Sequence, residues 1–472
     1  MASTSPLYVR EAMIAPQKPP SSAVGPVKWA RENLFSSPLN TLLTVLALYA
    51  VYFIVTLIGP WLLRAVWDAD SLQECRAIAG ARYGDGVEGA CLALIRERWN
   101  QLLFGFYPRE LYWRPVLAFL LLLAALAPAL FSAVPRKLLW LSALYPAVAF
   151  WLLWGGSVWL PVSIVLGLAV AGLAGVWVSS QRGLLFGALA FVAAFLAIFL
   201  NPVSIIVSVL GGIASLVVGG PVTIPTNLGA FDLADLMPLR DHFAAAMEAV
   251  APIGMRSLSS DSMGGFMLSL TIGISGITFS LPLGILLALG RQSDMVLVKT
   301  ICVGFIEIIR GVPLITLLFT ASLLLNYFLP PGTSFDIILR VIIMVTIFAA
   351  AYMAEVIRGG LAALPRGQYE AADALGLNYW QAQRQIIMPQ ALKVSIPSIV
   401  GNFIGLFKDT TLVIFIGLQD PLALVSAIRA DTAWSGTYWE PLMFVAALFF
   451  IVCFSMSRYS MYLEKKLKTD HR

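Results

Sequence analysis

The sequence predicts an all-α protein that crosses a membrane many times, and three observations support this class. Of the 472 residues, 59% are hydrophobic and only 12% are charged, whereas a soluble domain averages about a quarter charged. The mean hydropathy is +0.84. Apolar runs of about 20 residues, the length that spans a bilayer as a helix, recur along the chain. The composition therefore excludes the set of soluble domains that the length alone would suggest.

Ten segments have the length and composition of membrane spans. The first follows a polar, proline-rich stretch at 1–38 without the features of a cleavable signal, so we expect this span to remain as an anchor. A further apolar run at 203–219 is ambiguous, because it contains Gly211 and Gly212. The ten predicted spans are 39–63, 115–133, 137–154, 158–178, 184–200, 264–289, 299–328, 335–357, 395–417 and 440–463.

Basic residues indicate which ends of the spans face the cytoplasm, since cytoplasmic loops carry an excess of Lys and Arg. The tail contains Lys465, Lys466, Lys468 and Arg472, and the long connector before the ninth span is also basic. Counting back through ten spans places both termini in the cytoplasm. An eleventh span would invert the last five, so we expect 203–219 to be re-entrant or interfacial. The net charge of +5 is explained by basic cytoplasmic loops and does not require a nucleic-acid partner.

The predicted spans organise the chain into six segments. These are a cytoplasmic segment 1–38, a first transmembrane helix 39–63, an external loop 64–114 with an amphipathic helix, additional transmembrane helices 115–219, an external loop 220–263 and a C-terminal bundle 264–466.

The connector at 366–389 has strong local helix signals. Its sequence from Pro365 is PRGQYEAADALGLNYWQAQRQIIMP. Gly376 is a left-handed helix stop, and Asn378 with Gln381 resembles a capping box. We expect two short helices separated by a glycine turn. On physical grounds alone, either an interfacial helix that merely links two spans or a docking helix for a cytoplasmic subunit fits this pattern.

The docking hypothesis rests on six residues of the connector. Alanines give a smooth flank that another protein can approach closely, and two acids lie on one exposed face. The predicted docking residues are Glu370, Ala371, Ala372, Asp373, Gly376 and Pro389.

The same connector resembles the EAA loop of ATP-binding-cassette (ABC) importer permeases. That pattern is E-A-A, three residues, G, nine residues, I, one residue and L-P. Here Glu370, Gly376, Ile386 and Pro389 keep the spacing, with Met388 in place of Leu. Further stretches, including VGFIEIIRGVPLITLLF and FIGLFKDTTLV, resemble polar amino acid permeases over 264–466. The arrangement looks most like the permeases for glutamate, glutamine, aspartate and asparagine, or general L-amino acids, of alphaproteobacteria.

The resemblance implies a fold, a location and partners. It implies a type I ABC importer permease core with additional N-terminal transmembrane helices, in the bacterial inner membrane. It also implies an ABC ATPase homodimer that grips the coupling loop 366–389, a second permease subunit forming a heterodimer, and a periplasmic amino-acid-binding protein. ATP and magnesium would then be bound by the ATPase. If the loop 64–114 faces the oxidising periplasm, Cys75 and Cys91 form either a disulfide or two free thiols.

Charged residues inside predicted spans are costly and suggest function. Glu307 and Arg310 lie three apart on one helix face, just before a break at Gly311 and Pro313. They either neutralise each other or place Arg310 beside the substrate path, as broken helices do in other transporters.

A second polar stretch interrupts the ninth span. Lys408, Asp409, Thr410 and Thr411 follow one another, with Asn402 six residues before Lys408. We expect this stretch to face the substrate path or a subunit interface; a purely structural role is the alternative. At the end of 335–357, Glu355 and Arg358 are expected to form an interfacial ion pair.

No residues of this chain are predicted to carry out catalysis or to hold a cofactor. The two histidines are scattered, so no metal site is expected, and no Gly-rich loop ends in Gly-Lys-Ser/Thr, so ATP has no P-loop here. The alternative functions are an ion-gradient-driven secondary amino acid transporter, which would need no ATPase, and a membrane scaffold that recruits an enzyme.

Overall fold

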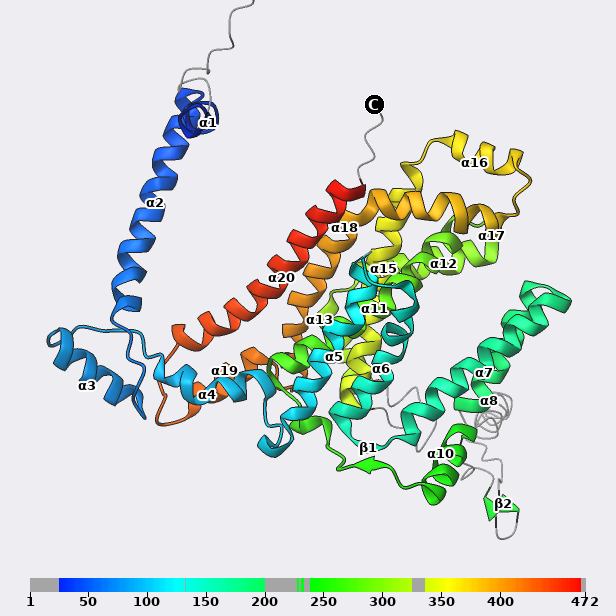
Figure 1. The fold of residues 1–472 in the computed structure, drawn as a ribbon, viewed down its shortest axis with the longest axis horizontal. Coiled ribbons are helices and arrows are strands. Elements are labelled where there is room, and N and C mark those ends of the chain that lie inside the picture. Colours follow the sequence, from blue (N-terminus) through cyan, green and yellow to red (C-terminus); the bar gives the residue numbers. More distant parts are fainter. Residues whose placement is uncertain are drawn as a thin grey trace, which may run out of the picture. The chain divides into compact units, whose positions relative to one another are not determined.

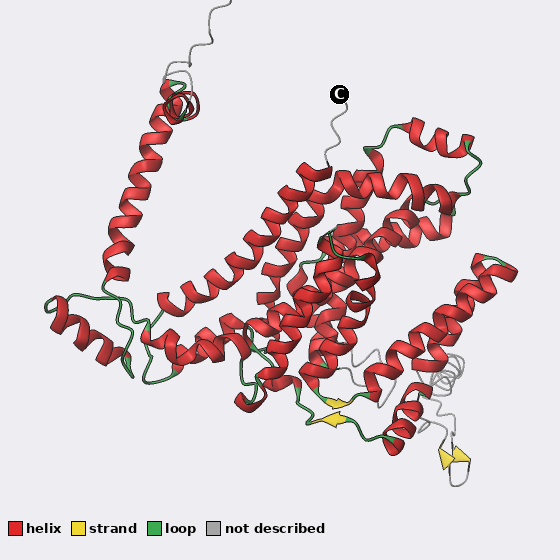
Figure 2. Cartoon of the chain, in the orientation of Figure 1, coloured by secondary structure: helices red, strands yellow, loops and turns green. Residues whose placement is uncertain are grey.

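The computed structural model describes residues 25–131, 133–199, 227–228, 231–232, 238–324 and 336–467. The predicted re-entrant run 203–219 lies outside these residues. The chain divides into two compact units, Met1–Leu94 and Ile95–Arg472. Figures 1 and 2 show that the described chain is almost entirely helical, with two short pairs of strands.

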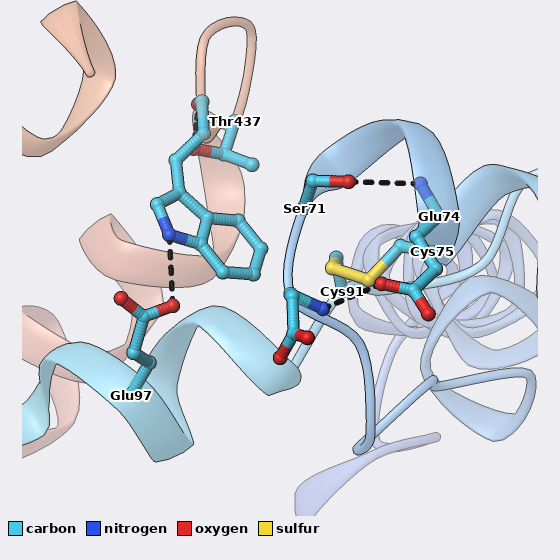
Figure 3. The surroundings of a disulfide bond; sticks show 8 residues. Ser71, Glu74, Cys75, Cys91, Glu97 and Thr437 are labelled. Carbon is cyan, nitrogen blue, oxygen red and sulfur yellow. Dashed lines mark hydrogen bonds between the residues drawn. A yellow bond between two sulfur atoms is a disulfide. The ribbon is translucent and has the colours of Figure 1, made fainter. Parts of the chain in front are cut away.

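The first unit contains a long apolar helix and a small disulfide-bonded subdomain. Helix α1 (Pro26–Asn33) precedes α2 (Pro38–Leu63), whose first turn is capped by the Ser37 side chain. Helix α3 (Leu72–Tyr83) is capped in the same way by Ser71, as Figure 3 shows. Cys75 of α3 and Cys91 are joined by a disulfide, with their Cα atoms 5.8 Å apart.

The second unit contains α4 and then four apolar helices, α5 to α8. Two-residue strands β1 and β4 pair antiparallel, with Gly156 opposite Met255; β2 and β3 pair in the same way. In chain order the elements are α4 (Ala93–Phe104), η1 (Arg109–Leu111), α5 (Trp113–Leu130), η2 (Arg136–Leu138), α6 (Leu139–Trp154), β1 (Gly156–Ser157), α7 (Trp159–Arg182), α8 (Leu184–Phe199), β2 (Asn227–Leu228), β3 (Phe231–Asp232), α10 (Leu239–Val250), β4 (Gly254–Met255) and η4 (Ser260–Ser262).

The C-terminal bundle completes the second unit. Its elements are α11 (Gly265–Gln292), α12 (Val296–Gly311), α13 (Leu314–Phe319), the π-helical η5 (Thr320–Leu324), α15 (Ile337–Ala362), α16 (Arg366–Ala374), α17 (Tyr379–Ala382), the π-helical η6 (Gln383–Ile387), α18 (Met388–Asp409), the 3₁₀-helical η7 (Thr410–Ile416), α19 (Pro421–Ala430) and α20 (Trp439–Leu467).

Glycine allows α11 and α15 to pack closely. A Cβ on Gly284 would stand 2.7 Å from Cβ of Met353, and one on Gly276 would stand 2.9 Å from Val345. Small residues take this role in membranes because lipid tails give helices little hydrophobic reason to associate. Two buried clusters result, one containing Leu268 and one containing Met353.

Within the described residues, eight helices are long and apolar enough to cross a membrane, and a bent pair forms a further candidate. Two of the ten expected spans are not among the eight, and one of them contains the break that the sequence predicted at Gly311 and Pro313. The run at 184–200 contains the helix α8, which is 16 residues long within the described part of the chain. The run at 299–328 is not straight: α12 and the following α13–η5 are bent by 103°. Pro313 has no N–H for a helix hydrogen bond, which accounts for the break there.

Asp420 begins α19 and is completely buried. Its carboxylate accepts hydrogen bonds from the backbone N–H groups of Ala423, at 2.9 Å, and Leu422, at 3.3 Å. Burial raises the pKa of Asp420 to about 6, although these two N–H donors act in the opposite direction.

Candidate functional site

The first half of the coupling loop (366–389) is a short helix that ends in a glycine turn. Gly376 has a φ of +68°, in the left-handed region. The N–H of Gly376 donates to the carbonyl of Asp373 at 2.9 Å, and that of Leu377 donates to Ala372 at 3.3 Å. This pair of bonds is the Schellman arrangement, which satisfies the last carbonyls of α16.

The second half begins with the capping box that the sequence indicated. The Asn378 side chain accepts from the Gln381 N–H at 2.9 Å, and the Gln381 side chain accepts from the Asn378 N–H at 3.0 Å. The chain then passes through π-helical η6 into α18. Pro389 cannot donate to the carbonyl four residues earlier, which favours a widened turn at this point.

The coupling loop is tied back to the bundle but leaves one face open. Gln390 donates to the Gln368 side chain at 2.9 Å, linking α18 to α16. Ala372 is 1% exposed, whereas Leu375 is 71% exposed. The other five predicted docking residues are exposed; they are Glu370, Ala371, Asp373, Gly376 and Pro389. Tyr379 and Trp380 are exposed as well. The open face therefore combines acidic and apolar groups, and sequence analysis missed the contribution of Leu375.

The two helices that flank the coupling loop are pressed together close to it. Figure 1 shows the loop between the end of α15 and the start of α18. A Cβ on Gly360 of α15 would stand 2.6 Å from the carbonyl oxygen of Ala391 on α18 and would also collide with Ser395 Oγ. Ser395 donates to the carbonyl of Val356 at 3.4 Å. Helices α15 and α18 are therefore in close contact beside the coupling loop.

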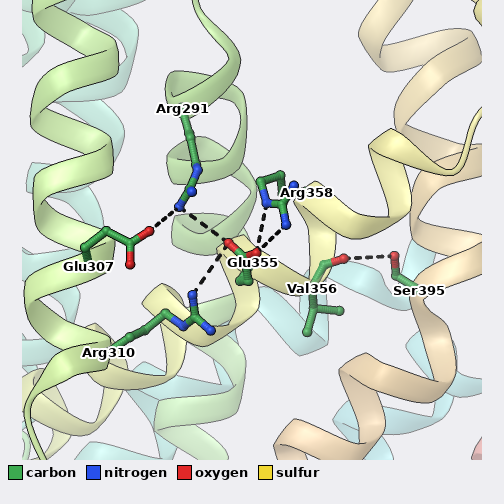
Figure 4. Close-up of polar contacts among 7 residues, drawn as sticks. All are labelled: Arg291, Glu307, Arg310, Glu355, Val356, Arg358 and Ser395. Carbon is green, nitrogen blue, oxygen red and sulfur yellow. Dashed lines mark hydrogen bonds and ion pairs between the residues drawn. The ribbon is translucent and has the colours of Figure 1, made fainter.

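Five charged residues meet beside these helices, and Figure 4 shows their arrangement. Glu355 of α15 lies between three arginines. Its Oε1 accepts from Arg358 Nε at 2.9 Å, and its Oε2 lies 3.4 Å from Arg291 Nη1 of α11 and 3.6 Å from Arg310 Nη1 of α12. Arg291 also donates to Glu307 Oε1 of α12 at 2.9 Å. We call these residues the charge network.

The network excludes one of the two alternatives for Glu307 and Arg310, namely an ion pair between them. Their spacing places them on one helix face, but Glu307 pairs with Arg291 and Arg310 pairs with Glu355. Arg310 also lies over the ring of Tyr352, 5.4 Å from its centroid. Helix α11 presents Arg291 to Glu307, and helix α15 presents Glu355 to Arg310. These contacts between helices replace the pair within α12. The expected ion pair of Glu355 with Arg358 is present.

The polar stretch near the end of α18 is arranged differently. The α-helical geometry of α18 ends at Asp409 and a 3₁₀-helix follows. Thr410 is buried and donates to the Phe407 carbonyl at 2.8 Å, while Thr411 donates to Lys408 at 3.0 Å. Asn402 donates to a carbonyl of its own helix. Lys408 is exposed and Asp409 half-buried, and neither has an ion pair among the described residues. The structure does not bring this stretch into the charge network.

Comparisons with known proteins identify the kind of molecule that carries these features. Residues 280–469 match the family model described as the binding-protein-dependent transport system inner membrane component. Over 473 residues, covering both chains completely, the sequence is 58% identical to the glutamate/glutamine/aspartate/asparagine transport system permease protein BztC of Rhodobacter capsulatus. The chain belongs to this permease family. It is a membrane-spanning permease subunit of an ABC importer, and the relatives do not support a secondary transporter.

Other permeases match either the whole chain or only its C-terminal bundle. The inner membrane amino-acid ABC transporter permease protein YhdY of Escherichia coli K12 is 35% identical and covers 93% of both chains. The glutamate/aspartate import permease GltK of E. coli O157:H7 is 31% identical over 43% of this chain and 91% of its own. A solved structure of an amino acid ABC transporter with histidines is 30% identical, covers 42% of this chain and 91% of its own, and has a TM-score of 0.38.

Proposed function

We propose that this permease moves polar and acidic L-amino acids, including glutamate, glutamine, aspartate and asparagine, from periplasm to cytoplasm by alternating access. The name of the Rhodobacter relative supports this substrate class, and the name of the E. coli K12 relative supports amino acids in general. The chain lies in the bacterial inner membrane with both termini in the cytoplasm, as its basic tail and connector favour.

The proposed assembly contains three kinds of partner. A homodimer of an ABC ATPase binds ATP and magnesium and drives the cycle. A second permease subunit pairs with this chain as a heterodimer, and a periplasmic amino-acid-binding protein delivers the substrate. The chain itself holds no nucleotide in this scheme.

The coupling loop is the observation that carries the proposal. It is a stiff helix–turn–helix unit, closed by a Schellman turn and a capping box, with an acidic and apolar face open on one side. A unit that only linked two spans would not need this open face. We infer that the ATPase binds it through Glu370, Ala371 and Asp373, and that closure of the ATPase dimer displaces α15 and α18 together.

The substrate path uses the polar stretch of α18. Lys408 is exposed on the surface of this chain within a candidate span, where a bare charge facing lipid is costly. We therefore place Lys408, with Asn402 and Asp409, against the path shared with the second permease, where its ammonium suits a substrate carboxylate. Thr410 and Thr411 hold the end of this helix, and Glu307 and Arg310 stand at the cytoplasmic end of the path.

Transport by the purified assembly tests the proposal. The four components are reconstituted in vesicles with labelled glutamate and the binding protein, and uptake is measured with and without ATP. We expect ATP-dependent uptake that Gly376→Arg abolishes while the chain still inserts. Uptake by this chain alone, or normal uptake by Gly376→Arg, would refute the proposed coupling.

A further inference from the structure

Glu355 joins three helices through a single carboxylate. Its Oε2 faces Arg291 on α11 and Arg310 on α12, and its Oε1 accepts from Arg358 on its own helix. The contacts to Arg291 and Arg310 are therefore links between helices, whereas the contact to Arg358 stays within α15. Figure 4 shows Glu355 between the arginines. Substitutions that remove contacts between helices should therefore have other effects than a substitution that removes only the contact within α15.

The position of Glu355 along α15 places it just before the coupling loop. The helix continues from Glu355 to Ala362, and α16 begins at Arg366. Between them, Gly360 lets α15 touch α18 closely. A displacement of the coupling loop would move Glu355 through the short, packed end of α15. Arg291 and Arg310 connect Glu355 to α11 and α12, so these helices would be displaced as well.

The links between helices are loose in this arrangement. Glu355 Oε2 and Arg310 Nε are buried without a hydrogen bond. The distances of 3.4 and 3.6 Å to the two guanidinium groups exceed the roughly 2.7–2.9 Å of a charge-assisted hydrogen bond. Buried polar atoms are nearly always satisfied, so such an exception calls for an explanation. A small shift of α15 toward α12 would bring Glu355 Oε2 within hydrogen-bond distance of Arg310 Nη1.

Helix α12 directs two of its charged residues to neighbouring helices and exposes apolar residues along its length. Leu297, Ile301 and Ile308 are exposed at helical spacing, whereas Glu307 and Arg310 pair with α11 and α15. Without Glu355, Arg310 would have no ion pair with any residue that the structure describes, although its side chain is only 32% exposed. Leaving one charge of a half-buried pair alone is costly, so the position of α12 depends on Glu355.

We propose that Glu355 is a positioning residue that transmits displacement of the coupling loop to α11 and α12 through Arg291 and Arg310. This assignment rests on the proposed ATP-driven transport and names the side chains that carry the motion across the bundle. Glu355 contacts no nucleotide in this scheme and needs no contact with substrate.

The experiment compares uptake with ATP hydrolysis in the same vesicles containing the complete assembly, the binding protein and labelled glutamate. We expect Glu355→Gln to lower the number of substrate molecules imported per ATP by about tenfold, because it removes both half-buried links between helices. Arg358→Gln is the matched control, since it removes the shortest contacts of Glu355 but no link between helices. We expect it to change the ratio by roughly twofold at most, because the Glu355–Arg358 pair lies within one helix and is partly exposed to solvent.

A purely stabilising role of the network predicts the opposite order. Arg358→Gln would then be at least as harmful as Glu355→Gln, and the amount of assembled complex would fall while the transport ratio stayed constant. Either result would overturn the proposal. If Glu355→Gln does not assemble, the double variant Arg291→Gln with Arg310→Gln removes the same two links, and an unchanged ratio in it counts against the proposal equally. Absence of ATP-driven uptake in the wild type would instead refute the proposed function.

Discussion

Replacing Gly376 with alanine tests whether the turn in the coupling loop acts through its backbone. The φ of +68° lies in the left-handed region, and no heavy atom stands within 4 Å of the position that a Cβ would occupy. The methyl group therefore meets no steric obstacle in this chain. Its effect should come from the left-handed conformation alone, which costs an ordinary residue about 1–2 kcal/mol.

That cost sets the size of the expected effect. A free-energy change of 1–2 kcal/mol corresponds to a factor of about 5–30 in a conformational equilibrium. We expect Gly376→Ala to reduce the population of the bent loop by this factor, and the apparent affinity of the ATPase for the permease pair to fall accordingly. The measurement is titration of the purified ATPase onto the permease pair in nanodiscs.

Asparagine supplies the matched control at the same position. Its side chain is larger than that of alanine, but asparagine enters the left-handed region more readily. If backbone strain governs the effect, Gly376→Asn will bind the ATPase more tightly than Gly376→Ala. If Gly376→Asn is instead the weaker of the two, the constraint is the space needed by the docked ATPase, and the explanation from backbone conformation is refuted.

Three other predictions concern separate features of the fold. Ala372→Leu should destabilise the coupling loop by about 1–3 kcal/mol, because Ala372 is buried there. Ala371→Leu, at an exposed site, should instead weaken ATPase binding without loss of stability. Proteolysis measures the first effect and ATPase titration the second. Cys75→Ser should cost the first unit about 3 kcal/mol, since the disulfide to Cys91 closes a loop with a sequence separation of 16, and a reducing agent should reproduce the loss in thermal unfolding. Asp420 has a pKa of about 6 in the folded protein, above its value in the unfolded chain, so its contribution to stability is highest at low pH and falls as pH rises from 4 through 6. Asp420→Asn should remove this fall of about 3 kcal/mol in the free energy of unfolding. Equal slopes of unfolding free energy against pH for the two proteins would contradict the burial argument.

Local sequence signals were enough to predict the coupling loop. The helix stop at Gly376 and the capping box at Asn378 depend on residues within a few positions of each other, and both are present. Helical spans could be predicted for the same reason, because the apolar run that fills a membrane is contiguous. The exposed side chain of Leu375 could not be foreseen, since its exposure depends on how α16 lies against the bundle.

The charge network shows where such signals fail. Spacing suggested that Glu307 and Arg310 neutralise each other, because both lie on one face of one helix. Their actual partners, Arg291 and Glu355, come from two other helices, and one sequence without an alignment does not indicate which helices will be neighbours. Spacing alone could predict only the Glu355–Arg358 pair, whose two residues lie three positions apart on α15.

Gly376 and Glu355 should fail in different ways, and this difference separates docking from transmission. Gly376→Ala lowers the population of the bent loop that the ATPase binds, so fewer assemblies are docked, but each docked assembly still imports substrate with normal yield per ATP. Glu355→Gln leaves that surface intact, so the ATPase binds normally while the yield per ATP falls. Binding affinity and transport yield, measured on both variants, should therefore each respond to one substitution only. If both quantities fell together in both variants, the coupling loop and the charge network would have to be one structural unit, and the division of roles between them would be wrong.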